Sequence, residues 1–404
     1  MATSRETTAA EAPVLVLWTG YRAGPWAVRS LRRAGHRVVA AHDAGRGSGG
    51  RSAAAPRPLR YPPPDADPEG FAAAVAAICR RGGVRAVLPV SEAVTRGLAL
   101  GTREEDLGGA RIVGPDARQY AALCDKARLP ASCASAGVDH PEQTVVGADG
   151  ARAGDWPSLP SVVKPAGSSE HLPGVPAAAR VETEGERRRV LDVFARAGVE
   201  AVVQEFVEGR PWLVHCVRRR DGFAAVALPV STTWPRGVGT SSVSRPAPAP
   251  EPLDAVARGV LDLVGYVGPA CMNVIERRGR FLLHDVNLRL AASVAASIHA
   301  GLDIPAEGVA AVLGLPAGPA PPDRPDVLYV RTDGEVAATL AAVRAGRFGP
   351  AGRMARELAR CWVSPRAVLD PAPLDPFWLW SLAEAPAVRA LRRARDRIRP
   401  GAGA

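Results

Sequence analysis

Lysine and asparagine are almost missing from this sequence of 404 residues. Lysine occurs only at Lys126 and Lys164, and asparagine only at Asn273 and Asn287, although lysine and arginine together number 51. Alanine, glycine, proline and arginine are abundant, which is typical of a GC-rich coding sequence. Under such a compositional bias, a lysine or asparagine that is kept is more often needed for its chemistry. These residues are therefore the first candidates for a functional site.

The sequence also lacks a long apolar run. No stretch of about 18 or more apolar residues occurs, so no membrane span is expected. The first dozen residues, MATSRETTAAEA, contain no apolar segment like that of a secretory signal, and we expect a cytoplasmic protein. The six cysteines are scattered, without a CxxC pair or a nearby histidine cluster. Neither a zinc site nor a disulfide framework is indicated, and we expect buried or free thiols.

A net charge of +10 raises the question of a nucleic-acid partner. The arginines are spread along the chain with few aromatic residues between them, which argues against such a partner. Their densest cluster, ALRRARDRIRP at 390–400, is expected to be the solvated face of a helix. The aromatic run FWLWSL at 377–382 is too short to span a membrane, and we expect it to pack against the body of the protein rather than lie on a membrane surface.

Length and composition predict two or three packed domains, and hydrophobic periodicity predicts an α/β protein. Residues 13–43 read as strand, helix and strand, and further strands are expected at 86–90 and 110–114. A long Gly/Arg/Pro-rich loop is expected over 44–70. The glycines of the first βαβ unit do not form the GxGxxG fingerprint of dinucleotide sites, which argues against an oxidoreductase.

The middle of the chain continues this alternation. Asp116 is placed to cap a helix that runs to Lys126, and we expect a loop region from there to about residue 158. The apolar strand SVVKP at 161–165 then leads into a glycine- and serine-rich loop, followed by the helix GERRRVLDVFARAG and the strand AVVQEFVEG.

Two hairpins are predicted in the second half. One turns at Asp221-Gly222 and the other at Arg278-Gly279, and the helix LDAVARGVLDLVG lies between them. Beyond Pro316 the composition shifts toward proline, which indicates an accessory segment.

Two features of this order point to phosphate chemistry. Lys126 follows a helix, and Lys164 ends a strand just before a loop whose backbone N–H groups can surround phosphate oxygens. The second hairpin ends in DVN, which places Asp285 and Asn287 on the same face of a strand. Their oxygens suit a hard cation such as Mg²⁺.

Taken together, these motifs resemble the ATP-grasp superfamily, and most closely its carboxylate–amine ligases, over roughly residues 13–310. The resemblance implies an α/β (α+β) protein in which an N-terminal Rossmann-like pre-ATP-grasp domain precedes a two-lobed ATP-grasp domain. The implied boundaries are a flexible N-terminus over 1–12, the first domain over 13–115, the ATP-grasp domain over 116–315 with a lid over about 125–204 and a second lobe over about 205–315, and a C-terminal accessory segment over 316–404.

The resemblance also implies how ATP is held. The segment CDK, which contains Lys126, and the segment VVKPAGSS, which contains Lys164, look like the segments that carry the two phosphate-binding lysines of the family. VVQEFVEG looks like the strand that holds adenine through its backbone, with a ribose contact at its end. Glu205 and Glu208 are almost equally well explained as exposed charges on an edge strand. The implied nucleotide contacts are Lys126, Lys164, Gly167, Ser168, Ser169, Gln204, Glu205, Phe206, Val207 and Glu208.

The family's hallmark of acid, apolar, Asn, Pro, Arg is similar to DVNLR. The resemblance implies Mg²⁺ ligands at Asp285, Asn287 and Asn273, and an Arg289 that binds phosphate or an acyl phosphate. It implies substrate contacts at Ser293 and Arg236, although Arg236 is equally well a loop arginine. His215 and His284 are expected to be packed strand residues.

The chain departs from the family pattern at the metal site. The upstream position that usually holds a glutamate falls on Asn273, the hallmark glutamate is Asp285, and the hallmark proline is Leu288. A different register would offer Glu276, but strict alternation puts its side chain on the opposite face from Asn273. Fewer acidic ligands should weaken Mg²⁺ binding unless the phosphates of the nucleotide supply the charge.

The resemblance thus implies a ligase that uses ATP and Mg²⁺ to join a small-molecule carboxylate to an amine, with amino acids as the expected substrates. An acyl phosphate would be the intermediate, and ADP and phosphate the other products. Lys164, Arg289 and Lys126 would be catalytic. The alternative is a catalytically degenerate protein that keeps the fold and serves as a nucleotide-binding or regulatory module. A nucleic-acid-binding protein is a weaker reading that rests on charge alone.

Overall fold

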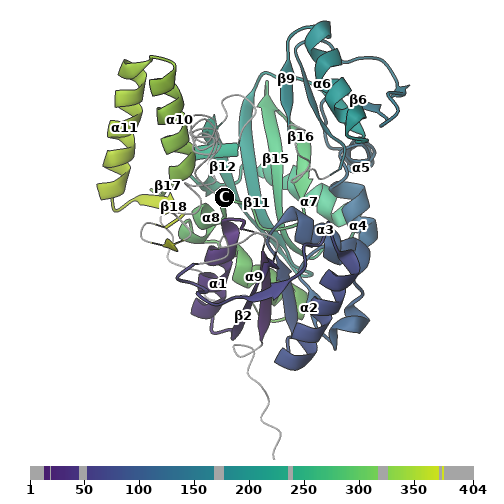
Figure 1. Ribbon diagram of the computed structural model, residues 1–404, viewed down its shortest axis with the longest axis vertical. Coiled ribbons are helices and arrows are strands. Elements are labelled where there is room, and N and C mark those ends of the chain that lie inside the picture. The colour runs from purple at the N-terminus through teal and green to yellow at the C-terminus, as the bar shows by residue number, and fades with distance from the viewer. Residues whose placement is uncertain are drawn as a thin grey trace, which may run out of the picture.

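The computed structural model describes residues 13–18, 20–44, 52–167, 177–234, 240–316, 326–372 and 375–376. The described chain forms three sheets, each built from one continuous part of the sequence. In Figure 1 the first sheet and its helices lie at the bottom, the second sheet lies at the top with α6 (Glu184–Arg196), and the long strands of the third lie between them.

The first sheet is parallel, with strand order β3-β2-β1-β4-β5. Every residue of its central strand is buried, because helices cover both of its faces. The predicted loop over 44–70 is wrong in part, since it contains a short edge strand and the first turn of a helix. The elements are β1 (Val14–Trp18), α1 (Ala23–Arg33), β2 (Val38–Asp43), β3 (Leu59–Tyr61), α2 (Pro68–Gly82), β4 (Ala86–Pro89), α3 (Glu92–Gly101), η3 (Glu104–Leu107) and β5 (Arg111–Ile112).

The second sheet is antiparallel, with order β7-β6-β10-β8-β9. The prediction of a cap at Asp116 is confirmed, since its side chain accepts a hydrogen bond from Gln119 N at 2.7 Å. The prediction of a loop up to about residue 158 is wrong. A helix and two short strands form there, and their many polar and small residues give no clear hydrophobic periodicity. The elements are α4 (Ala117–Leu123), α5 (Leu129–Ser135), β6 (Gln143–Val146), β7 (Arg152–Ala153), β8 (Ser161–Pro165), β9 (Ala179–Val181), α6 and β10 (Ala201–Glu205).

The third sheet has the order β16-β15-β11-β12-β13-β17-β18, with β14 paired to β12. Its last two strands come from the segment beyond residue 316, so that segment extends the sheet. The elements are β11 (Arg210–Arg218), β12 (Phe223–Trp234), β13 (Thr240–Ser244), β14 (Ala247–Pro248), α7 (Glu251–Leu263), β15 (Gly268–Arg277), β16 (Arg280–Asn287), α8 (Val294–His299), α9 (Ile304–Leu313), β17 (Leu328–Arg331), α10 (Thr332–Arg344), α11 (Phe348–Val363) and β18 (Ala367–Asp370).

Both predicted hairpins are confirmed. β11 pairs with β12 across the Asp221-Gly222 turn, and β15 pairs with β16 across Arg278-Gly279. Arg278 and Gly279 have φ values of 53° and 77°, the positive pair that a two-residue type I′ turn requires. This turn sets the register of β15 against β16, and the register decides which side chains meet at the end of the hairpin.

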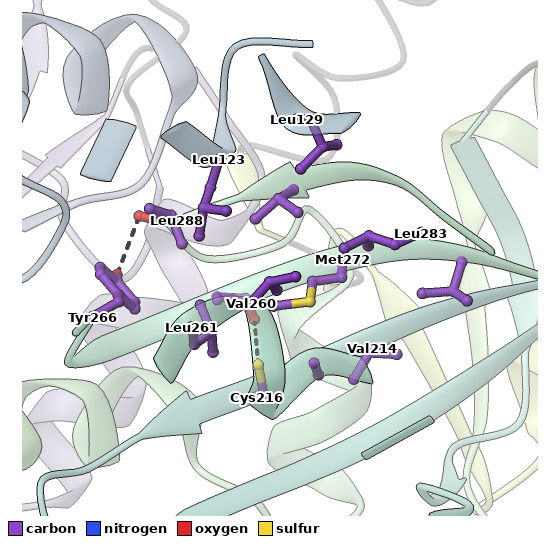
Figure 2. Packing of buried hydrophobic residues seen from close by; sticks show 14 of the residues in the cluster. Leu123, Leu129, Val214, Cys216, Val260, Leu261, Tyr266, Met272, Leu283 and Leu288 are labelled. Atoms are coloured by element: carbon purple, nitrogen blue, oxygen red, sulfur yellow. Dashed lines mark hydrogen bonds between the residues drawn. The ribbon is translucent and has the colours of Figure 1, made fainter. Parts of the chain in front are cut away.

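One face of this hairpin belongs to the largest hydrophobic cluster. Met272 and Val274 of β15 and Leu283 of β16 are fully buried against α7, with Val260 and Leu261 on its inner face (Figure 2). Because side chains alternate along a strand, the residues between these apolar positions project to the opposite face. The core therefore fixes the orientation of the polar side chains on the other side of the same strands. These are Asn273, Asp285 and Asn287, called the polar row below.

The segment beyond residue 316 is tied to the region around α1 by buried polar contacts. Arg22, just before α1, forms a salt bridge with Asp333 of α10 at 2.8 Å. The indole Nε1 of Trp26 donates to Asp370 Oδ1 at 3.0 Å, and Tyr329 OH donates to Asp370 Oδ2 at 2.7 Å. Burial opposes the charged form of Arg22, but Asp333 outweighs it and raises the pKa of the guanidinium. The hairpin of α10 and α11 projects from this junction in Figure 1.

All six cysteines are free; Cys361 is half-buried and the others are buried, as predicted. Burial raises the pKa of the Cys79 thiol to about 11, so it is not a reactive thiolate. Among the helices that the structure describes, none is long and apolar enough to cross a membrane.

Candidate functional site

Three of the predicted site residues meet at the open end of the β15–β16 hairpin. Asn273 of β15 lies directly opposite Asp285 of β16. Asp285 Oδ2 accepts hydrogen bonds from Asn273 Nδ2 at 2.9 Å and from Asn287 Nδ2 at 3.0 Å. Both asparagines of the chain therefore contact one carboxylate, as the sequence suggested when it placed them on the same pair of strands.

A β-bulge shapes this end of the hairpin. Asn273 pairs with Asp285 but Val274 pairs with Leu283, so His284 is an extra residue on β16. The bulge lets Leu283 stay in the core while Asp285 joins the polar row. It also leaves the carbonyl oxygen of His284 available to a side chain outside the sheet.

Lys126 binds to this carboxylate from the segment after α4. Its Nζ lies 3.4 Å from Asp285 Oδ1. Its backbone is fixed at both ends, because Lys126 N donates to Ala166 O at 2.9 Å and Lys126 O accepts from Gln143 Nε2 at 2.6 Å. Burial tends to raise the pKa of Asp285, but Lys126 and then Lys164 outweigh it, and the pKa lies well below its usual range.

Lys164 lies near the end of β8, and its side chain is buried. Its Nζ donates to Gln204 Oε1 and to the carbonyl oxygen of His284, both at 3.0 Å. Burial is the main reason that the pKa of Lys164 is lowered to about 8, and it is only partly offset by the charge of Asp285. The two lysines of the chain thus contact neighbouring residues, His284 and Asp285, from two different elements.

Arg289 follows β16 and is anchored by the first domain. Its Nε donates to Glu92 Oε2 at 2.9 Å and its NH1 donates to Tyr21 OH at 2.8 Å, while the guanidinium lies 5.0 Å from the centre of the Tyr21 ring. Its NH2 donates to Asn287 Oδ1 at 3.0 Å. Tyr120 OH donates to the other oxygen of Glu92 at 2.7 Å. Arg289 therefore links the first domain to the polar row.

Glu92 and Tyr21 were missed by sequence reasoning. Glu92 begins α3 after the buried strand β4, and Tyr21 follows β1, so both lie at the carboxyl ends of parallel strands. Open α/β sheets bind ligands at that edge. A glutamate directly after a buried strand was therefore the signal in the sequence that could have identified Glu92. Glu92 is only 7% exposed, which shows that the acid is enclosed rather than solvated.

The strand that was predicted to bind adenine leads from the second sheet to the third. β10 lies between β6 and β8, so Glu205 at its end is not on an edge strand; it forms a salt bridge with Arg277 at 2.7 Å. Gln204 is buried beside Lys164, and Arg180 lies over the ring of Phe206 at 3.9 Å. Val207 is buried and Glu208 is exposed. Their part in nucleotide binding stays a prediction.

Ser293 is held by a buried histidine. Its Oγ lies 3.1 Å from His215 Nε2, and the Nδ1 of the same ring contacts Ser297 Oγ at 2.5 Å. Burial lowers the pKa of His215 to about 3, so the ring is neutral. The prediction that His215 is a packed strand residue is confirmed, whereas the substrate role of Ser293 stays a prediction.

Some predicted residues lie outside the described part of the chain: Ser168, Ser169, Arg236, and the segments at 377–382 and 390–400. Gly167, just before the first of these, is exposed.

The donor set suits one hard cation. Asp285 offers carboxylate oxygens, while Asn273 and Asn287 turn their amide nitrogens toward it and Asn287 Oδ1 accepts from Arg289; the amide oxygens become ligands when these side chains rotate. Glu276 is not part of the set, since its Oε2 accepts from Trp212 Nε1 at 3.0 Å. Within the described residues, no three His, Cys, Asp or Glu side chains come together as a metal-binding group.

Comparisons with known proteins give structural matches only. No protein-family profile matches the chain. No curated protein matches it either. An N5-carboxyaminoimidazole ribonucleotide synthetase bound to ADP aligns with a TM-score of 0.62 at 14% identity, covering 83% of this chain and 85% of that one.

Two further solved structures are similar. The L-amino acid ligase of Bacillus licheniformis aligns with a TM-score of 0.60 at 15% identity, over 75% of this chain and 74% of that one. The biotin carboxylase of Campylobacter jejuni, solved with a form of ATP, aligns with a TM-score of 0.57 at 16% identity, over 76% and 73%. At such identities the likeness concerns the fold.

Proposed function

The chain has the ATP-grasp fold that its motifs predicted, and from that premise we propose that it is an ATP-dependent carboxylate–amine ligase. The observation that carries the proposal is the convergence of Lys126 and Lys164 on the end of β16. Two ammonium groups next to a single carboxylate form a site that favours a polyphosphate. The similar fold of an enzyme named as an L-amino acid ligase supports amino acids as the substrates.

The proposed reaction has two steps. In the first, an oxygen of the substrate carboxylate attacks the γ-phosphorus of ATP, and the bond from that phosphorus to the bridging oxygen breaks, so that ADP leaves with the electron pair. In the second, the amine nitrogen attacks the acyl carbon, the bond from that carbon to the phosphate oxygen breaks, and phosphate leaves. The nitrogen loses a proton, which leaves an amide.

The residues of the chain act mainly by position and charge in this proposal. Lys164 and Lys126 neutralise phosphate oxygens, and the burial of Lys164 and the partial burial of Lys126 strengthen that effect relative to water. Arg289 holds Asn287 in place and adds positive charge beside the reacting groups. Glu92 and Tyr21 fix the guanidinium of Arg289, so the first domain would contribute to the site through them.

A divalent cation fits the proposal. Asp285 and Asn287, with Asn273 beside them, would hold Mg²⁺, which when bound shields the charge of the phosphates. The amide groups would have to present their oxygens rather than their nitrogens, which a rotation of each side chain allows; for Asn287 this rotation gives up its hydrogen bond from Arg289.

One observation favours a second candidate function. Asn273 stands where a second carboxylate would make a stronger cation site, and it donates to Asp285 instead. A protein that keeps ATP binding but no longer turns it over, and acts as a nucleotide-binding or regulatory module, would tolerate this substitution.

Formation of ADP tests the two candidates. The purified protein is incubated with ATP, Mg²⁺ and a mixture of amino acids, and the nucleotide products are separated. ADP that depends on both Mg²⁺ and the mixture supports the ligase. AMP would reject the acyl-phosphate route, and tight ATP binding without any product would favour the regulatory module.

The pKa of Lys164 predicts a pH dependence of ATP binding. Burial lowers it to about 8, so the ammonium is charged below that pH and loses its proton above it. We expect the dissociation constant for ATP, measured by calorimetry, to rise by up to about tenfold per pH unit above the pKa. The Lys164→Met variant should lack this dependence, and an unchanged affinity in the wild type up to about pH 9.5 would contradict the role of Lys164.

The same pKa sets the sign of a stability change in the free protein. The unfolded chain holds the proton of Lys164 more tightly than the folded one, because the pKa in the folded protein lies below the ordinary lysine value of 10.5. The contribution of this residue to the free energy of unfolding should therefore increase as the pH rises from about 8 to about 10.5.

A further inference from the structure

Both carboxylate oxygens of Asp285 already contact N–H groups of other side chains in the protein. Oδ2 accepts from the amides of Asn273 and Asn287, and Oδ1 faces the ammonium of Lys126. The side chains of Lys126 and Asp285 are each only 21% exposed, so water screens this ion pair less than it would at the surface. The charge of this carboxylate is thus already matched by Lys126 before any ligand arrives.

Among the residues that the structure describes, no second carboxylate stands beside Asp285 to replace it. Glu92, which contacts Arg289, is already used, since its two oxygens accept from Arg289 and from Tyr120. Glu276 is used by Trp212 on the other face of the sheet. Among the described residues, therefore, a hard divalent cation would depend on a single carboxylate for anionic ligands.

A divalent cation and Lys126 would compete for this carboxylate. Two positive groups against Oδ1 repel one another strongly at such short distances. A polyphosphate removes the conflict, because its oxygens are alternative partners for the lysine and additional ligands for the cation. The flexible stem of a lysine allows its ammonium to move between the two while its backbone stays fixed to Ala166 and Gln143.

We propose that Lys126 is the built-in counter-ion of Asp285, so that a divalent cation enters the site only together with the nucleotide, one cation per nucleotide. The inference rests on the proposed function, since it takes ATP as the ligand that draws Lys126 away. It gives Lys126 a task beyond phosphate binding: it keeps the site closed to free cations.

Mn²⁺ binding tests the inference directly. Free Mn²⁺ is measured by electron paramagnetic resonance in titrations of the wild-type protein, alone and with a non-hydrolysable ATP analogue. The binding of the analogue itself is measured by calorimetry, both in EDTA and with Mn²⁺. We expect weak Mn²⁺ binding without the analogue and one tightly bound Mn²⁺ per protein with it. Equal Mn²⁺ affinity in both titrations, or two tight Mn²⁺ ions with the analogue, would overturn the inference and leave the ligase proposal standing.

The chain supplies a matched pair of variants. Lys126→Met removes the counter-ion and should raise the affinity for Mn²⁺ in the absence of nucleotide by about tenfold or more. Lys164→Met removes the only other lysine, which contacts Gln204 and His284 O instead of the carboxylate, and should raise it much less. An equal rise in both variants would show a general charge effect and contradict the specific role of Lys126. If Lys126→Met does not fold, the wild-type titrations still decide the matter.

A separate outcome would concern the proposed function itself. If the analogue does not bind to the wild-type protein in calorimetry either in EDTA or with Mn²⁺, the ATP-dependent reaction is rejected, and the inference with it. That result differs visibly from the two Mn²⁺ outcomes above, because each of those requires a bound analogue.

Discussion

Replacing Lys164 by methionine should lower the rate of ADP formation by about 10² to 10³-fold, the loss typical of removing one preorganised group that stabilises developing charge. Methionine matches the shape of the lysine stem, so the buried volume beside Gln204 is retained. The carbonyl of His284 loses a charged donor, but it stays at the bulge that the core of β15 and β16 imposes. The expected defect is therefore in chemistry and in ATP binding rather than in the fold.

The measurement is the steady-state rate of ADP release, with circular dichroism and gel filtration as checks on folding. Lys164→Arg is the second variant, since it keeps the positive charge but not the compact ammonium. We expect it to recover part of the ATP affinity and little of the rate. A folded Lys164→Met protein with a normal rate would reject the ligase proposal for this site.

Asp285→Asn should have an effect of similar size by a different route. The substitution keeps the shape of the side chain but removes the only carboxylate of the polar row, so a divalent cation loses its one anionic protein ligand. We expect turnover to fall by about 10² to 10³-fold at any practical Mg²⁺ concentration.

ATP affinity in EDTA distinguishes this variant from an unfolded one. Removing the carboxylate frees Lys126 and takes away a negative charge close to the phosphates, so metal-free ATP should bind as tightly as in the wild type or more tightly. Asp262→Asn, which breaks only a half-exposed pair with Arg218, is the control and should leave both quantities unchanged. Loss of metal-free ATP binding in Asp285→Asn would contradict the proposed geometry.

Much of the site could be predicted because its residues are rare and lie on regular elements. Strand alternation correctly placed Asp285 and Asn287 on one face, and the Arg278-Gly279 turn brought Asn273 opposite them. A shortage of lysine and asparagine made the remaining ones informative, and all of them meet at this site. The prediction depended on local rules that a sequence carries by itself.

What could not be predicted depends on contacts between distant segments. Glu92 is separated from Arg289 by 197 positions, and nothing local to either residue indicates that they pair. The bulge at His284 is also invisible in the sequence, since strict alternation along FLLHDVN would put Leu283 and Asp285 on the same face. The loop over 126–158 was misread because the helix and strands there are short and their apolar residues few.

The salt bridge between Arg22 and Asp333 has a consequence for how the protein is made. The two residues are 311 positions apart, so at about 5–20 residues per second a ribosome adds Asp333 roughly 15–60 s after Arg22. During that interval the parallel sheet of the first domain carries an apolar surface around α1 that lacks its later covering, and an arginine without its eventual carboxylate. The nascent chain is therefore expected to need shielding, by a chaperone or by the ribosome surface, until its last quarter has emerged.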